Sequence, residues 1–92
     1  MVRSGFGKRF PARNSAVAKT LASNIRRLRK AREWTQDNLA AEAEVEQAAI
    51  SLIENGRANP TLLMLENIAR ALEISVVELL ESHSRPRRSK DK

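Results

Sequence analysis

Two short amphipathic segments separated by a three-residue turn constrain the fold of this chain more than any other feature. The first segment runs from residue 36 to about 43, and the second from 47 to about 54. Ala40 and Ala43 are small, as close contact between two helices requires. The second segment ends at Asn55-Gly56, which is typical of a helix C-terminus. The pattern therefore predicts two helices packed at a tight corner, with the outer face of the second left free.

Three further helices are expected around this pair. The first runs from Ser15 to near Arg32, with apolar residues at steps of four, four and three, which mark one face of a helix. These residues are Val17, Leu21, Ile25 and Leu28. Trp34 follows as a packing residue at the corner, where Thr35 is a favourable N-cap.

The last two helices are predicted from their caps. The earlier one opens at Asn59-Pro60-Thr61, with either Asn59 or Thr61 as its N-cap. Its expected inner face consists of Leu65, Ile68, Ala69 and Leu72. The later one begins at Ser75, which forms a capping box with Glu78, and ends near Ser82. The fold class is therefore all-α, with five helices between residues 15 and 82 and no strand.

Charge is concentrated at the two ends of the chain. The net charge is +6, but residues 16–82 carry eight bases and ten acids, a net charge of −2. Residues 1–15 carry +4 and residues 83–92 carry +4. We expect residues 1–14 to form a flexible basic arm and 83–92 a disordered basic tail. Basic flanks on a nearly neutral domain suit a polyanion such as nucleic acid, although tails that merely improve solubility are the alternative.

Composition argues against most catalytic chemistry. The chain has no cysteine and a single histidine, His83, so it lacks thiolate ligands, a His-based metal cluster and a catalytic triad. No Gly-rich phosphate loop is present. No apolar run reaches signal-peptide length after the basic N-terminus or the roughly 20 residues of a membrane span. We expect a cytoplasmic, non-membrane protein that is not an enzyme and needs neither metal nor cofactor.

Many positions at fixed spacing resemble one family, the Cro/C1-type (XRE) helix-turn-helix regulators of bacteria and phages. The resemblance extends from Leu21 to Leu80. The matching residues are Thr35-Gln36, Leu39-Ala40, Val45, Ile50-Ser51, Ile53-Glu54, Asn55-Gly56, Pro60, Leu65, Ile68-Ala69, Leu72 and Leu79. It implies a five-helix, lambda repressor-like domain. The implied function is that of a sequence-specific transcriptional regulator, a repressor or autoregulator, whose second corner helix enters the DNA major groove.

The resemblance also assigns roles to individual residues. The expected base-reading residues are Gln47, Ala48, Ala49 and Leu52. The expected phosphate contacts are Thr35, Gln36, Asn55 and Arg57. Adenine is the geometrically favoured partner of Gln47, whereas the two alanines and Leu52 can only meet thymine methyls or allow close approach. Arg29 and Glu54 are implied to form a structural ion pair.

Two glutamates depart from the family pattern near the expected DNA face, and a third lies close to them. Glu44 occupies a turn position that usually carries Gly, because a positive φ is costly for other residues. Glu46 stands where the second corner helix usually has a Ser or Thr cap. With Glu42, these acids should repel phosphate, so attraction has to come from the bases of the first helix and from the flanks.

A homodimer on a two-fold operator is the favoured assembly, since one such domain makes few base contacts. The expected interface residues are apolar positions of the last two helices: Leu62, Leu63, Met64, Val76, Val77 and Leu80. The alternative is that all of these residues belong to the core. A second function also remains open, that of an antitoxin-like protein that neutralises a partner toxin. A toxin or a polymerase is thus a conceivable protein partner beside double-stranded DNA.

Overall fold

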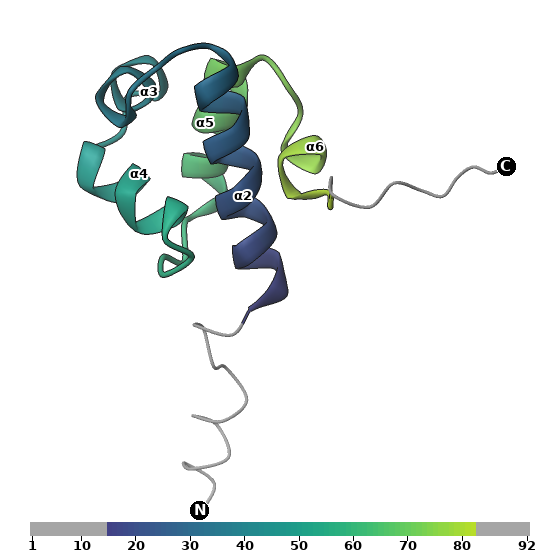
Figure 1. Ribbon diagram of the computed structural model, residues 1–92. Helices are drawn as coiled ribbons and strands as arrows, with labels where there is room; N and C mark the ends of the chain where they lie inside the picture. Colours follow the sequence, from purple (N-terminus) through teal and green to yellow (C-terminus); the bar gives the residue numbers. More distant parts are fainter. Residues whose placement is uncertain (1–14, 83–92) are drawn as a thin grey trace, which may run out of the picture.

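The computed structural model describes residues 15–82; the basic arm and tail expected at 1–14 and 83–92 lie outside this range. Five helices and no strand occur within it, as the sequence predicts. They are α2 (Ala16–Ala31), α3 (Gln36–Ala43), α4 (Gln47–Glu54), α5 (Leu62–Leu72) and α6 (Val76–Leu80). In Figure 1, α3 and α4 lie on one side of α2 and α6 lies on the other, with α5 behind α2.

Each helix contributes a side chain with no exposed surface to one shared core. These side chains are Ile25 of α2, Leu39 of α3, Ile50 of α4, Ile68 of α5 and Leu79 of α6. The small residues predicted at the corner, Ala40 and Ala43, are also buried. A single core therefore fixes the orientation of α4 relative to α2 and α3, and with it any surface that α4 presents.

Side-chain caps define the start of four helices. The hydroxyl oxygens of Ser15, Thr35, Thr61 and Ser75 each accept the backbone N–H three residues ahead. Thr61, rather than Asn59, is thus the cap of α5. The capping box predicted between Ser75 and Glu78 is present. Glu46 makes no side-chain cap bond at the start of α4, which is consistent with a poorer capping residue.

Two sequence predictions are wrong in detail. Val17 was expected on the buried face of the first helix, yet it is 57% exposed. It lies in the first turn of α2, which extends past α4 and α6 in Figure 1, so that no other helix of the described residues covers it. The fifth helix ends at Leu80 rather than near Ser82, because Glu81 already has an extended backbone.

Three glutamates adopt a left-handed backbone within two residues of a helix end. Glu33, Glu44 and Glu73 have φ values of 60°, 59° and 60°. In each case the next residue donates its N–H to the carbonyl five positions earlier, as Val45 does to Ala40 at 3.0 Å. This six-to-one bond closes a Schellman-type helix end, at which glycine is the usual left-handed residue. The strain expected at Glu44 is confirmed, and it recurs at two positions that the sequence did not single out.

Glu44→Gly should stabilise the domain by about 0.5–1 kcal/mol. The left-handed conformation costs a non-glycine residue about 1–2 kcal/mol, and the greater unfolded-state entropy of glycine offsets part of the gain. Glu42→Gly, the same change inside α3, should instead destabilise by about 0.5–1 kcal/mol. Urea unfolding followed by the fluorescence of Trp34, the only tryptophan, measures both. A lower urea midpoint for Glu44→Gly would contradict the strain argument.

Candidate nucleic-acid interface

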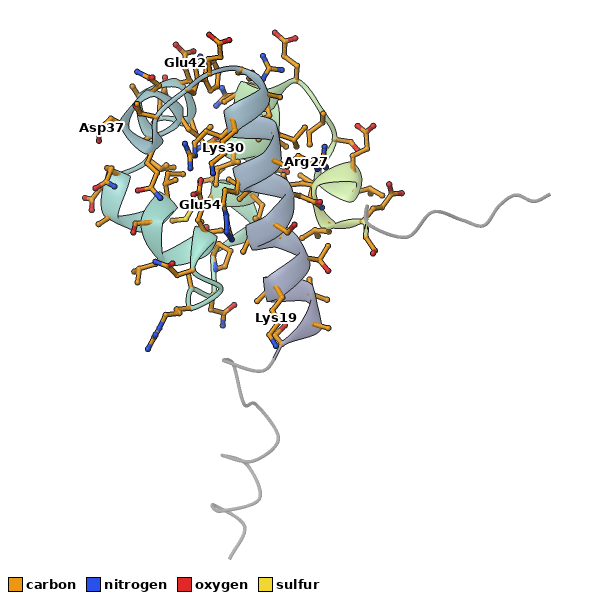
Figure 2. The ribbon with its side chains drawn as sticks, in the orientation of Figure 1. Lys19, Arg27, Lys30, Asp37, Glu42 and Glu54 are labelled. Atoms are coloured by element: carbon orange, nitrogen blue, oxygen red, sulfur yellow. The ribbon has the colours of Figure 1, made fainter. Side chains whose placement is uncertain are left out.

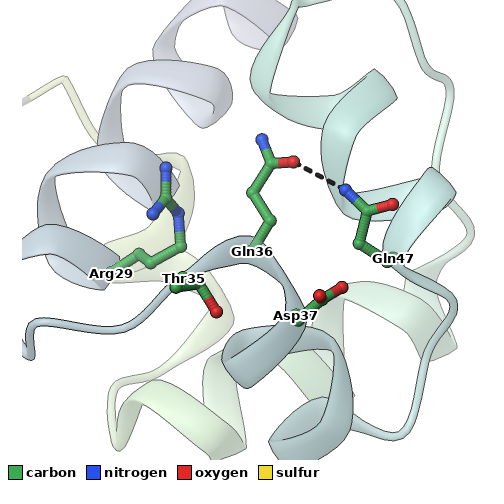
Figure 3. Close-up of a pocket in the computed structure, with 5 residues that line it drawn as sticks. All are labelled: Arg29, Thr35, Gln36, Asp37 and Gln47. Atoms are coloured by element: carbon green, nitrogen blue, oxygen red, sulfur yellow. Dashed lines mark hydrogen bonds between the residues drawn. The ribbon is translucent and has the colours of Figure 1, made fainter.

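The first residues of α3 and α4 meet at a shallow hollow of about 500 Å³. Figure 3 shows the side chains that line it, which are Arg29, Thr35, Gln36, Asp37 and Gln47. Across the hollow, the Gln47 Nε2 donates a hydrogen bond of 2.7 Å to the Gln36 Oε1. The two residues expected to contact a phosphate and a base are thus brought together by one bond.

Beneath this bond lies the pair implied between Arg29 and Glu54. The Arg29 Nε lies 2.7 Å from one Glu54 carboxylate oxygen, and its Nη2 lies 2.9 Å from the other. The side chains are only 11% and 5% exposed. Arg29 also donates to the carbonyl of Trp34 at 2.8 Å, while Arg26 donates to the carbonyl of Glu54 at 2.9 Å. These bonds tie the end of α4 to α2 and to the corner before α3.

Glu54 is held in its charged form by its neighbours. Burial alone raises the pKa of the Glu54 carboxyl, but hydrogen bonds from Arg29 and Gln36 and the positive charges of Arg29 and Arg26 outweigh it. The pKa of Glu54 consequently lies below its usual value. The hydrogen bond to Glu54 likewise raises the pKa of the Arg29 guanidinium. Both partners are therefore ionised near neutral pH.

Gln36 connects the ion pair to the hollow. Its Nε2 donates to the Glu54 Oε1 at 3.1 Å, while its Oε1 accepts from Gln47. A continuous chain of side-chain bonds thus leads from Arg29 through Glu54 and Gln36 to Gln47 at the start of α4. The family resemblance implied the pair of Arg29 and Glu54 and indicated Gln36 and Gln47 separately, but it did not indicate the chain of bonds that joins all four.

Within residues 15–82, nothing covers the outer face of α4, and this face is nearly uncharged. Gln47 and Ala48 are exposed, Leu52 is 50% exposed, and Ala49 is half-buried. The remaining expected phosphate contacts, Thr35, Asn55 and Arg57, are exposed at the two ends of the corner. Asn55 caps α4, and Gly56 then takes a φ of 69°, as the sequence predicts for this helix end.

Charge is divided between neighbouring helices on this side of the molecule. α2 contains basic residues and no acid, and Figure 2 shows Lys19, Arg27 and Lys30 along it. α3 instead carries Asp37 and Glu42, which project away from the core in the same view. Glu44 and Glu46 are exposed in the turn that follows. A polyanion near α4 would therefore be attracted by α2 and repelled by the outer edge of α3.

Two residues form structural hydrogen bonds that the sequence does not predict. Asn24 is 2% exposed and donates to the carbonyls of Leu79 and Glu81, both at 2.8 Å, which fixes α6 against α2. Its position three residues after Leu21, on the apolar face of the helix, is the signal that could have identified it. Arg32 donates at 2.7 Å to the carbonyl of Leu72 at the end of α5. No periodicity reveals such a bond between distant helices.

Within residues 15–82, no group of acidic or histidine side chains is arranged to hold a metal ion, and no helix is long and apolar enough to cross a membrane. What this part of the chain does present is a short helix with a free outer face, held at a tight corner and bonded to the start of the preceding helix. This arrangement is that of a helix-turn-helix DNA-binding domain.

The family assignment follows from sequence comparison. The chain matches the helix-turn-helix family HTH_3 over residues 25–79, and it belongs to this XRE-type family of transcription regulators. An uncharacterised HTH-type transcriptional regulator of Sinorhizobium fredii is 40% identical over 64 residues, which cover 70% of this chain and 83% of that protein. The family resemblance read from the sequence is thus confirmed.

Two further relatives have more specific names. The immunity repressor protein of Bacillus phage phi105 is 40% identical over 57 residues, which are 62% of this chain and 40% of the repressor. The antitoxin HipB of Escherichia coli is 38% identical over 56 residues, 61% of this chain and 64% of HipB. This chain therefore spans less than two thirds of either relative.

Solved structures have the same fold. A hypothetical transcription factor, NHTF, from Neisseria superposes with a TM-score of 0.69 at 30% identity, covering 72% of this chain and 76% of NHTF. The restriction-modification controller protein C.AhdI from Aeromonas hydrophila gives a TM-score of 0.67 at 28% identity, covering 71% of this chain and 98% of the controller. The five-helix architecture is therefore shared with both of these proteins.

Proposed function

We propose that this protein is a cytoplasmic repressor or autoregulator that binds a two-fold DNA operator as a homodimer. The observation that carries the proposal is the bond between Gln36 and Gln47, which holds a polar side chain at the start of α4, beside an exposed outer face without charge. A helix of this kind fits the major groove, where base edges are read by bidentate hydrogen bonds. The name of the phage immunity repressor supports the repressor role.

The interface residues divide into two kinds of contact. Gln47, with Ala48, Ala49 and Leu52 beside it, is proposed to meet base edges. The residues at the ends of the corner are proposed to contact phosphates and so fix the position of the helix. These are Thr35, Gln36, Asn55 and Arg57. The bases of α2 supply attraction that offsets the acids of α3 and of the turn.

Gln47→Ala should weaken binding to the selected operator by about 1–3 kcal/mol and relax the preference at one base position. The reason is that only a side chain facing a base edge discriminates between bases. Arg57→Ala is the matched control, because loss of a phosphate contact should weaken binding to all sequences alike. It should also reduce the slope of log affinity against log salt concentration by about one. Titration of labelled duplexes at several salt concentrations measures both. An unchanged base preference in Gln47→Ala would remove this residue from the readout.

Exposed apolar side chains on the last two helices support the proposed dimer. Leu62 and Leu63 at the start of α5 are 74% and 66% exposed, and Val77 of α6 is 66% exposed. Large apolar side chains left in solvent indicate an interaction surface, and a two-fold dimer would bury the same surface on both copies. Met64, Val76 and Leu80 are half-buried and pack against the core, so they would contribute to such an interface only at its inner edge.

An antitoxin-like role is the second candidate, favoured by the similarity to HipB. In that case the chain would bind a toxin through a surface outside α4 and would still regulate its own operon. Purification of the protein from its native cell distinguishes the two roles. A stoichiometric second protein would support the antitoxin role, whereas a homodimer alone would support the simple regulator. RNA polymerase is a further proposed protein partner, both for a simple regulator and for an antitoxin that regulates its own operon.

A further inference from the structure

We propose that α2 carries a binding site for a phosphate group, separate from the surface proposed to read DNA bases. The site is a shallow hollow of about 250 Å³, the α2 hollow, which is lined by Ser23, Arg26, Arg27 and Lys30. None of these four residues belongs to the proposed base or phosphate contacts of the corner between α3 and α4. The phosphate is carried either by a free small molecule or by the DNA backbone beside α4, and only the second source rests on the proposed function.

The spacing of the four residues places their side chains on one face of α2. They follow one another at steps of three, one and three, and helix residues three or four positions apart are neighbours on the surface. Figure 2 shows Arg27 and Lys30 along this helix. α2 contains no acidic residue, and none of the three basic side chains forms an ion pair with another part of the chain that the structure describes. Three positive charges without a partner thus surround one hollow, which favours an anion.

Arg26 supplies the most specific observation. Its Nη2 donates to the backbone carbonyl of Glu54 at 2.9 Å, which holds the guanidinium against the end of α4. Its Nε is buried and has no hydrogen-bond partner among the described residues. Buried donors in folded proteins nearly always have an acceptor, so this N–H calls for one. Because Arg26 lines the α2 hollow, a small rotation of its side chain would bring the N–H to an oxygen bound there.

Arg27 is held in place by a residue that is itself fixed. Its Nη2 donates to the Oδ1 of Asn24 at 3.3 Å, and Asn24 is 2% exposed and bonded to the carbonyl of Leu79 in α6. Each of the two arginines thus uses one N–H within the protein and keeps others of its five for a ligand. Side chains that are already held lose little freedom when a ligand binds, so the site is partly formed in advance.

The donors of the α2 hollow suit a phosphate better than a carboxylate. Two guanidinium groups, an ammonium group and the Ser23 hydroxyl come from four side chains spread over two turns of α2. A phosphate group is tetrahedral and directs its oxygens apart, so several such donors can reach it together, whereas a planar carboxylate is matched by a single guanidinium. The volume of the hollow is several times the roughly 30 Å³ that one water molecule occupies, which leaves room for one phosphate group.

Titration of the full-length, nitrogen-15-labelled protein with inorganic phosphate, followed by NMR, tests the site. We expect saturable shifts of the Arg26 Nε–H signal and of the backbone amides of residues 23–30. Chloride at the same ionic strength is the reference, because exposed charges attract any anion and are screened by salt. Arg27→Gln should weaken phosphate binding by about three- to tenfold, between the effect of an exposed ion pair and that of a buried hydrogen bond to a charged group.

Arg70→Gln is the matched control for Arg27→Gln. Arg70 is exposed on α5, and its Nη2 donates to the Oδ1 of Asn67 at 3.0 Å. Each variant therefore removes one positive charge and one bond to an asparagine three residues earlier, but only Arg27 lines the α2 hollow. Arg70→Gln should bind phosphate as wild type does, and unchanged amide signals elsewhere show that both variants are folded. Equal weakening by the two variants, or no saturable shift in residues 23–30 of wild type, would overturn the site.

Ethylation interference on the operator selected by wild type identifies the source of the phosphate. If the DNA backbone supplies it, ethylation of one backbone phosphate should weaken binding by wild type but not by Arg27→Gln, and the operator should displace inorganic phosphate from the α2 hollow. If a free molecule supplies it, no such backbone position exists and inorganic phosphate stays bound in the operator complex. If wild type selects no DNA sequence, the proposed function fails, whereas the titration still decides whether the α2 hollow binds phosphate.

Discussion

Glu54→Ala should cost the domain about 3–5 kcal/mol of unfolding free energy, the expected result of leaving one partner of a buried ion pair without the other. The Arg29 guanidinium would keep its charge in a site where its side chain is only 11% exposed. Gln36 and Arg29 would also lose the acceptors that the carboxylate provides. For a domain of this size, whose total stability is expected near the lower end of about 5–15 kcal/mol, such a loss brings it close to unfolding.

Urea unfolding followed by Trp34 fluorescence measures the effect, and a double-mutant cycle with Arg29→Ala isolates the pair. The coupling energy should be large, with the double variant less destabilised than the sum of the two single variants. Lys30→Ala is the matched control, because Lys30 is exposed on the same helix and its removal should change stability by less than about 0.5 kcal/mol. A cycle without coupling energy would refute a stabilising role of the pair.

Replacing Leu63 with glutamate should separate the proposed dimer and weaken operator binding by about 10²- to 10⁴-fold, the range by which linked binding exceeds single-site binding. Leu63 is 66% exposed, so the charge should not disturb the core of the monomer. A glutamate on both copies would place two like charges within the same interface. Light scattering and operator titration should therefore report a monomer that binds poorly.

Val17→Glu provides the matched control for self-association. Val17 is 57% exposed and equally apolar, but it lies on the first turn of α2 rather than on α5 or α6. This variant should remain a dimer. If Leu63→Glu also remains a dimer and binds the operator with wild-type affinity, the interface between copies lies on another surface.

The sequence predicted the helices well because four of the five described helices begin at a residue that caps them with its own side chain. Thr35 and Ser75 are capping residues whose bonds form within a single turn, so three-residue spacing is enough to identify them. The core face of α5 was equally predictable from the sequence, since its apolar residues follow the helical period. These residues, which are all buried, are Leu65, Ile68, Ala69 and Leu72. The exposure of Val17 could not be predicted from the sequence, because it depends on where the neighbouring helices end.

The candidate site was predictable as a set of residues but not as a mechanism. Family resemblance identified Arg29 and Glu54 as a pair, and Gln36 and Gln47 as separate contacts. Their connection depends on the packing of α2, α3 and α4, which brings residues 18 positions apart, Gln36 and Glu54, to a distance of 3.1 Å. Asn24 and Arg32 were missed for the same reason, since their partners are backbone carbonyls in distant parts of the chain.

Selection of bound sites from random duplex DNA by the wild-type protein tests the central claim most directly. A homodimer that places one α4 in each half-site should enrich an inverted repeat whose half-sites are centred about 10 bp, or a multiple of that, apart. Each half-site should contain one adenine whose selection depends on Gln47. Enrichment of a single unrepeated site, or of no sequence above background, would contradict the account.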